Sequence, residues 1–194
     1  MQNIDDFIRE NTVNHPRVTD TIALREIRNI GQNRLLKSYS DMLMEKTERE
    51  ILWFANKLSK LINGSLRNFS NTDVFLLREL IQPAKWYTLV TEELPPPTRH
   101  TPRLTLSSLM TTWSLAHEKL HDLVMENGYD KLSRDFGVPK YFLTNLFSYR
   151  IQKLPDGNGR RVLKSLPNYH VIRAFRQVVN PDLWYIYPEE LEEN

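Results

Sequence analysis

The segment LPPPTRHTP, residues 94–102, sets the main limit on how this chain folds because it contains three consecutive prolines. Proline has no backbone N–H and a fixed φ, so the segment cannot continue a helix and favours an extended polyproline II conformation. We therefore expect a helical association module over residues 1–94, a proline-rich connector over 95–103 and a second domain over 104–194. A chain of 194 residues is long enough to bury a real core.

The composition is that of an ordinary globular protein, with 40% hydrophobic and 26% charged residues. Cysteine is absent, which excludes disulfide bonds and thiolate metal sites and favours a reducing compartment. No run of about 18 apolar residues occurs, and the beginning, MQNIDDFIRENTV, has no basic segment followed by an apolar one. We therefore expect a soluble, cytoplasmic protein that does not associate with a membrane.

Helical periodicity dominates the first half of the chain. Between Gly31 and Gly64 apolar residues recur at steps of three and four, apart from an eight-residue gap around Thr47, which predicts one long amphipathic helix. This helix is the natural element for dimerisation, although it could equally form the core of a monomer. Shorter helices are predicted over residues 19–31 and 71–81.

The stretch AHEKLHDLV, residues 116–124, contains the pattern H-E-x-x-H in His117, Glu118 and His121, within a helix predicted over 105–127. In zinc peptidases the two histidines bind the metal and the glutamate activates the metal-bound water, but a third protein ligand is obligatory. The following residues supply neither the glycine nor the third histidine of the metzincin extension. We therefore place both histidines on the polar side of the helix and expect no metal, no cofactor and no enzymatic activity; a small zinc peptidase is the alternative.

Directly after this helix stands YDKLSRDFGVPKYFLTNLFSYR. With Gly137 in a turn between two helices, the small Ser133 falls where the helices approach most closely. Gly137 provides the permissive backbone that the turn needs, and Pro139 is acceptable in the first turn of the next helix. The positions that must be buried then carry apolar residues, namely Leu132, Phe136, Val138, Leu143 and Leu146.

This pattern resembles the helix-turn-helix superfamily, which includes many bacterial, phage and plasmid regulators. The resemblance implies that the second helix, from Pro139 to about Gln152, lies in the major groove of DNA with its first residues at the base edges. A plain helical hairpin with a glycine turn is the alternative. The side chains that the resemblance assigns to DNA are Lys140, Tyr141, Thr144, Asn145 and Ser148.

Basic charge is concentrated around this motif. Residues 129–179 contain ten Lys or Arg and three Asp, a net charge of +7, whereas the whole chain carries +2. Within this part, two short β-permissive runs flank the turn sequence D-G-N-G at residues 156–159, which predicts a hairpin. The hairpin resembles the wing of winged helix-turn-helix proteins and is expected to contact the DNA backbone or the minor groove. Its cations are Arg150, Lys153, Arg160, Arg161 and Lys164.

The sequence thus predicts a mainly α-helical protein with a winged helix-turn-helix and a short β-hairpin. We expect a sequence-specific double-stranded DNA-binding protein that acts as a homodimer in transcriptional regulation. Two alternatives are a phage or plasmid replication, partition or packaging protein, whose amino-terminal module recruits a protein partner, and a purely structural adaptor. Near the end, Trp184, Tyr185 and Tyr187 are expected to cover the domain core, or to dock on the amino-terminal half or on a partner.

Overall fold

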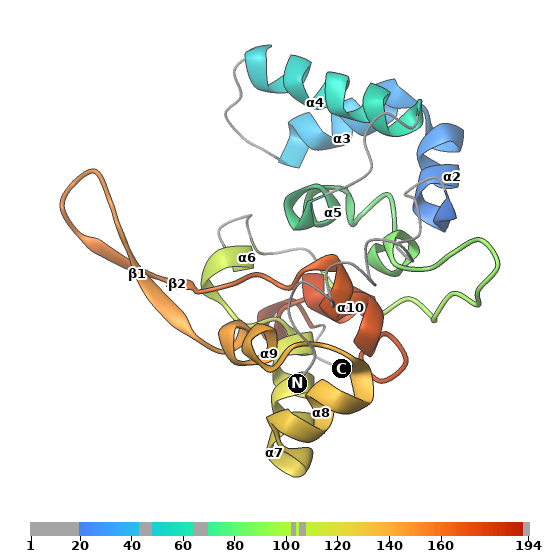
Figure 1. Ribbon diagram of the computed structural model, residues 1–194. Helices are drawn as coiled ribbons and strands as arrows, with labels where there is room; N and C mark the ends of the chain where they lie inside the picture. Colours follow the sequence, from blue (N-terminus) through green and yellow to red (C-terminus); the bar gives the residue numbers. More distant parts are fainter. Residues whose placement is uncertain (1–19, 43–47, 64–69, 102–103, 105–107, 192–194) are drawn as a thin grey trace. The chain divides into compact units, whose positions relative to one another are not determined.

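The structure, a computed structural model, is mainly helical and contains one two-stranded antiparallel sheet in the described part of its carboxyl-terminal half (Figure 1). Both features confirm the coarse fold class. Contacts divide the chain into an amino-terminal unit within residues 16–97 and a carboxy-terminal unit that contains residues 98–194. No described helix is both long and apolar enough to cross a membrane. The residues that the structure describes are 20–42, 48–63, 70–101, 104 and 108–191.

In the amino-terminal unit the predicted single long helix between Gly31 and Gly64 is wrong. Two helices occur instead, and they pack against each other. The gap in apolar periodicity around Thr47 removes the continuous stripe that one long helix needs, and two shorter helices bury their apolar sides together. Thr47 and Gly64 themselves lie outside the described residues. The helices of this unit are α2 (Ile22–Ile30), α3 (Gln32–Met42), α4 (Glu48–Ile62), α5 (Asn71–Leu77) and the 3-10 helix η2 (Pro83–Trp86).

Each of these helices contributes to a core that belongs to the amino-terminal unit. The side chains are at most 1% exposed, so they are removed from water almost completely. Burial of a large apolar side chain contributes about 1.5–3 kcal/mol, which makes this core the main stabilising element of the unit. The core residues include Leu24, Ile27, Leu35, Phe54, Leu58, Phe75 and Trp86.

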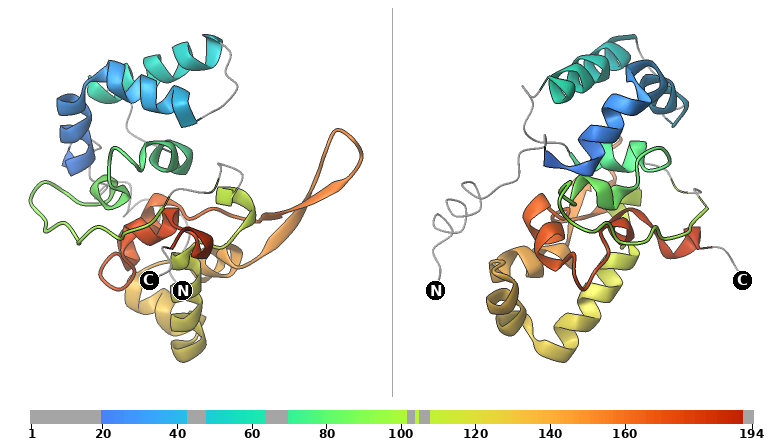
Figure 2. Two further views of the ribbon diagram at one scale, coloured as in Figure 1. Left: turned by 180° about the vertical axis from the view of Figure 1, so that it is seen from behind. Right: turned by 90° about the vertical axis from the view of Figure 1, so that its right-hand side faces the viewer.

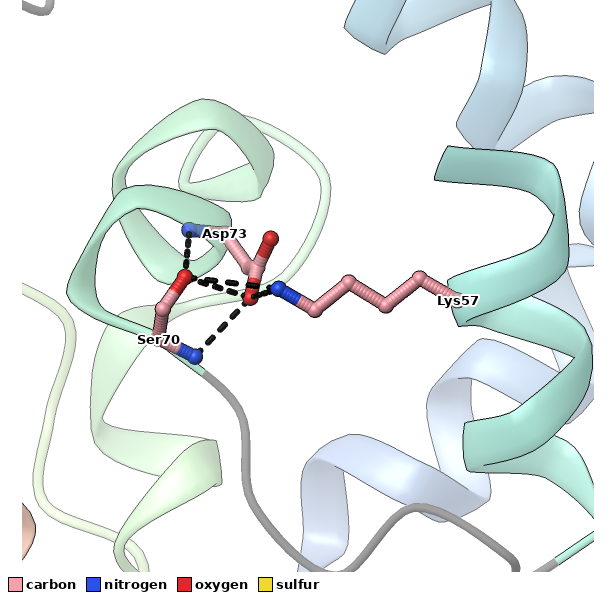
Figure 3. A network of polar contacts seen from close by, with 3 residues as sticks. All are labelled: Lys57, Ser70 and Asp73. Carbon is pink, nitrogen blue, oxygen red and sulfur yellow. Dashed lines mark hydrogen bonds and ion pairs between the residues drawn. The ribbon is translucent and has the colours of Figure 1, made fainter. Parts of the chain in front are cut away.

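A polar network fixes the beginning of α5 and connects it to α4 (Figure 3). The Ser70 hydroxyl oxygen accepts the Asp73 backbone N–H at 3.3 Å, and the Asp73 carboxylate accepts the Ser70 N–H at 2.8 Å, which is a capping box. The Lys57 ammonium of α4 pairs with the same carboxylate. This helix ends at Leu77 rather than at the predicted Ile81.

In the carboxy-terminal unit, the helix predicted over residues 105–127 is interrupted at Ser114. The extended backbone of Ser114 caps α7. Residues 105–107 lie outside the described part of the chain. Trp184, Tyr185 and Tyr187 are each at most 1% exposed, which confirms that they cover the core of this unit. Its elements are α6 (Ser108–Thr111), α7 (Leu115–Asn127), α8 (Tyr129–Phe136), α9 (Lys140–Leu146), β1 (Tyr149–Lys153), β2 (Gly159–Leu163), α10 (Tyr169–Phe175) and the 3-10 helices η3 (Pro181–Tyr185) and η4 (Pro188–Glu190).

Strands β1 and β2 form the predicted hairpin, which projects from the helices of the carboxy-terminal unit (Figures 1 and 2). Gly157 has a φ of 85° in the turn, a value that other residues rarely adopt. The Asp156 carboxylate accepts the Asn158 backbone N–H at 3.0 Å and also contacts its side-chain amide. These two hydrogen bonds lower the pKa of Asp156, so the carboxylate is held in its charged form by the turn itself.

Candidate nucleic-acid interface

The turn between α8 and α9 is built on Gly137. Its φ of 64° and ψ of 28° place it in the left-handed region, where it ends α8. The Val138 N–H then donates to the Ser133 carbonyl at 3.1 Å, and α9 begins directly after Pro139. A residue other than glycine, asparagine or aspartate would strain this backbone, so the sequence specifies the turn locally.

Most of the side chains that were predicted to be buried between these helices are buried. Phe136 is half-buried and stacks on Phe175 of α10, with 4.2 Å between the ring centroids. Since α8 also contacts α7 and α9, the pair of helices is fixed by packing on several sides. The fully buried members of the predicted set are Leu132, Val138, Leu143 and Leu146, at 3%, 1%, 0% and 1% exposure.

The outer side of α9 presents polar groups with few internal bonds. Lys140 is exposed and pairs with Asp130 of α8, with 2.8 Å between the ammonium nitrogen and a carboxylate oxygen. Both side chains are more than half exposed, so this pair stabilises the fold weakly. Asn145 is half-buried, and its side-chain amide forms no hydrogen bond with any other described residue. Its donor and acceptor are therefore available to a ligand.

Two further side chains of α9 lie at the same surface. Tyr141 is 40% exposed and packs its ring against Phe142 at 4.2 Å between centroids. Burial raises the pKa of Tyr141 above its usual value, and its hydroxyl can donate a hydrogen bond. The Thr144 hydroxyl donates to the Tyr141 carbonyl at 3.1 Å, which leaves its methyl group and oxygen lone pairs for other contacts.

Helix α9 is shorter than the predicted span from Pro139 to Gln152, because it ends at Leu146. The β-permissive residues that follow pair with β2 instead of continuing the helix, so Arg150 lies on β1. Ser148 lies in the connection, where its hydroxyl donates to the Thr144 carbonyl at 2.8 Å. The expectation that Ser148 belongs to the second helix is thus wrong.

The base of the hairpin is attached to the end of α9. The Lys164 backbone N–H donates to the Ser148 carbonyl at 2.7 Å. This hydrogen bond extends the β1–β2 ladder by one pair and closes the hairpin two residues after α9 ends. We call the polar side chains of α9 and the cations of the adjoining hairpin together the basic surface, although the cations lie on both faces of the ribbon. It comprises Lys140, Tyr141, Thr144, Asn145, Arg150, Lys153, Arg160, Arg161 and Lys164.

Charge on the hairpin is almost entirely positive. Residues 149–164 contain five Lys or Arg and one acidic residue, Asp156, which the turn already uses. Arg160 is half-buried, and the other four cations are exposed. Cross-strand pairing places Arg161 on the face of Tyr149, and its guanidinium lies 3.9 Å from the centroid of that ring.

His117 is buried rather than placed on the polar side of α7, so that expectation is wrong. It is 3% exposed because it follows the same helical stripe as the buried Ala116, Leu120 and Val124. Its Nδ1 atom accepts the Ser114 N–H at 3.1 Å. Burial lowers the pKa of His117 to about 3, so the ring is neutral at physiological pH.

The remaining features of H-E-x-x-H do not assemble a zinc site. His121 is half-buried and lies against Trp113 and Phe147, with ring centroids 5.4 Å apart in both cases. The Nδ1 atom of His117 is occupied by the cap of α7. Among the described residues no three His, Cys, Asp or Glu side chains lie close enough together to hold a metal ion.

Two residues of the hairpin, Ile151 and Gly159, were not predicted to be functional, and Gly159 was expected only as the last residue of the D-G-N-G turn. The signal that identifies them is the register: pairing outward from the D-G-N-G turn places Lys153 opposite Gly159 and Ile151 opposite Arg161. Comparison of the chain with family models, with curated proteins and with solved structures found no match.

Proposed function

We propose that this protein binds double-stranded DNA with α9 in the major groove and the β1–β2 hairpin against the sugar-phosphate backbone or the minor groove. The observation that supports this proposal is the basic surface, in which a cationic hairpin follows closely on a helix whose Asn145 amide has no hydrogen-bond partner among the described residues. The major groove is wide enough for an α-helix, and a two-stranded ribbon fits either groove.

The side chains of α9 suit base edges. An asparagine amide matches the donor and acceptor of adenine N6 and N7, and Asn145 has both groups available. Lys140 can donate to O6 or N7 of guanine once its exposed pair with Asp130 opens. Tyr141 can donate to a phosphate. These groups would provide sequence preference, and the hairpin would provide affinity.

The biological role that we propose is transcriptional regulation by a dimer. Helix α9 has seven residues and can reach few base pairs, so two copies on a symmetric site would give useful specificity. The long helix that motivated the dimer is absent, and α3 and α4 use each other as partners. We therefore propose dimerisation only because a single α9 reaches too few base pairs and a second half-site would be needed. A role in replication, partition or packaging would use the same surface to bind DNA.

The test is a measurement of binding to duplexes selected from a random pool, at several salt concentrations. If five hairpin cations contact phosphates, the logarithm of the affinity should fall with the logarithm of salt with a slope of up to about −4.5. A matched control removes two exposed cations of the amino-terminal unit, Arg34 and Lys60, by substitution with Ala, and should leave the slope unchanged. Absence of salt-dependent binding to any duplex would overturn the proposal.

A further inference from the structure

Ile151 is an apolar side chain in an unusual place. It lies at the centre of β1 and is 69% exposed. The register places it on the same face as Lys153 and Arg161, which are both exposed cations. A large β-branched side chain in water among positive charges gains nothing from burial within this chain.

The opposite strand leaves room for this side chain. A Cβ atom on Gly159 would lie 2.7 Å from the Cγ2 atom of Ile151, which is closer than real Cβ atoms approach another atom. Gly159 does not have a positive φ, so its backbone does not require glycine. Glycine weakens a strand, and in a strand it often marks a close approach. Its presence here therefore fits a need to keep Ile151 where it is.

The charges around Ile151 limit the chemistry of its partner. Lys153 and Arg161 are exposed on the same face of the ribbon, Arg150 is exposed next to it on the other face, and the one carboxylate of the hairpin is engaged in the turn. A partner that complements this hairpin is therefore a polyanion with an apolar interior that Ile151 can reach. The base stack of a duplex, reached between two phosphate strands, has this combination.

We infer that Ile151 inserts between two base pairs from the minor groove and that the hairpin thereby kinks the duplex. This inference rests on the proposed DNA binding and adds to it a mode of contact. Apolar wedges that enter the minor groove partly unstack a base step and bend the duplex away from it. Pyrimidine–purine steps unstack most easily, so the kink should fall at such a step within the bound site.

The test uses the full chain and duplexes carrying a fluorophore at each end, from which energy transfer reports the bend at saturating protein. The wild type should shorten the end-to-end distance by an amount that corresponds to a bend of about 20–90°. Ile151→Ala should abolish most of the bend, whereas Ile151→Val should retain most of it. Both variants keep every charge, so the salt slope should be that of the wild type.

Gly159→Ala provides an independent variant because it keeps Ile151 but forces its side chain to move. It should reduce the bend as well. The control is Val90→Ala, which removes an exposed apolar side chain, 52% exposed, from the amino-terminal unit. It should change neither affinity nor bend.

The outcomes separate the two proposals. Salt-dependent binding by the wild type without a bend, or an unchanged bend in Ile151→Ala, overturns the wedge and leaves DNA binding intact. Absence of binding by a wild type that is folded by circular dichroism overturns both. A bend that disappears in Ile151→Ala and Gly159→Ala, but not in Ile151→Val or Val90→Ala, supports the wedge.

Discussion

Asn145 is the side chain of α9 best suited to distinguish one base from another. Its amide has no hydrogen-bond partner among the described residues and reaches the surface. We therefore expect Asn145→Ala to weaken binding to a preferred site by about 1–3 kcal/mol more than it weakens binding to random DNA. Competition binding with both duplexes measures this difference. Gln152→Ala, which removes an exposed amide from β1, is the control. Equal losses on the two duplexes would remove Asn145 from base recognition.

His117 couples folding to pH. Its pKa is lowered to about 3 in the folded chain, from the ordinary value of 6.5, because the ring is buried. Between these two values the unfolded chain binds more protons than the folded one, so stability decreases as the pH falls through this range. Where the ring is protonated in the unfolded chain and neutral in the folded one, the free energy of unfolding falls by up to about 1.4 kcal/mol for each pH unit of acidification.

The prediction for His117 is tested with His117→Gln. From pH 7 to pH 5 the wild type should lose roughly 2 kcal/mol of unfolding free energy beyond what the variant loses. Urea unfolding at the two pH values measures both proteins. The readout is the pH dependence rather than the stability at one pH, because loss of the hydrogen bond to Ser114 also destabilises the variant. Parallel pH profiles would contradict the prediction.

At the scale of elements, the hairpin and α9 should have separable effects on DNA binding. Arg160 and Arg161 lie next to each other on β2, one on each face of the ribbon. Replacing both with Ala should weaken binding to all sequences alike and reduce the salt slope by about 1.8, since two phosphate contacts are lost. A salt titration on preferred and random duplexes measures this. A loss confined to the preferred duplex would show that the hairpin reads bases.

Local signals predicted the elements whose conformation is set by a few neighbouring residues. The turn at Gly137 and the hairpin turn at residues 156–159 depend on backbone conformations that glycine adopts readily, and both are present. The predicted length of α9 was wrong because the residues after Leu146 pair with β2, and strand pairing depends on a partner that helix propensity does not take into account. The single helix predicted after Gly31 was wrong because the gap in its apolar pattern was not treated as a break, and α3 and α4 pack against each other.

The residues of the candidate site were likewise predictable only where local sequence signals identify them. The sequence identified the cations and polar residues of the basic surface, because net charge and motif spacing are local properties. It missed the burial of His117, since a histidine on an amphipathic helix can face either side until the neighbouring aromatic Trp184 is placed. It also missed Ile151, because the role that we propose for this side chain depends on which residues lie opposite it in the hairpin.

For the whole molecule, the question is how much the amino-terminal unit matters to the basic surface. Each unit has its own buried core: Leu58 is 0% exposed in one, and Leu143 is 0% exposed in the other. Replacing either with Ala should destabilise its own unit by about 2–5 kcal/mol. The proposed contacts with DNA all lie in the carboxy-terminal unit, so the two substitutions should differ in their effect on DNA.

We expect Leu143→Ala to weaken DNA binding, because it loosens α9, and Leu58→Ala to leave the affinity within about twofold of the wild type at a temperature where both are folded. Hydrogen exchange followed by mass spectrometry should show faster exchange in residues 20–97 for Leu58→Ala and in residues 108–191 for Leu143→Ala. If Leu58→Ala weakened binding as strongly as Leu143→Ala, the amino-terminal unit would have to contribute to the DNA complex. Its helices would then hold either DNA directly or the second copy of the chain that a symmetric site requires.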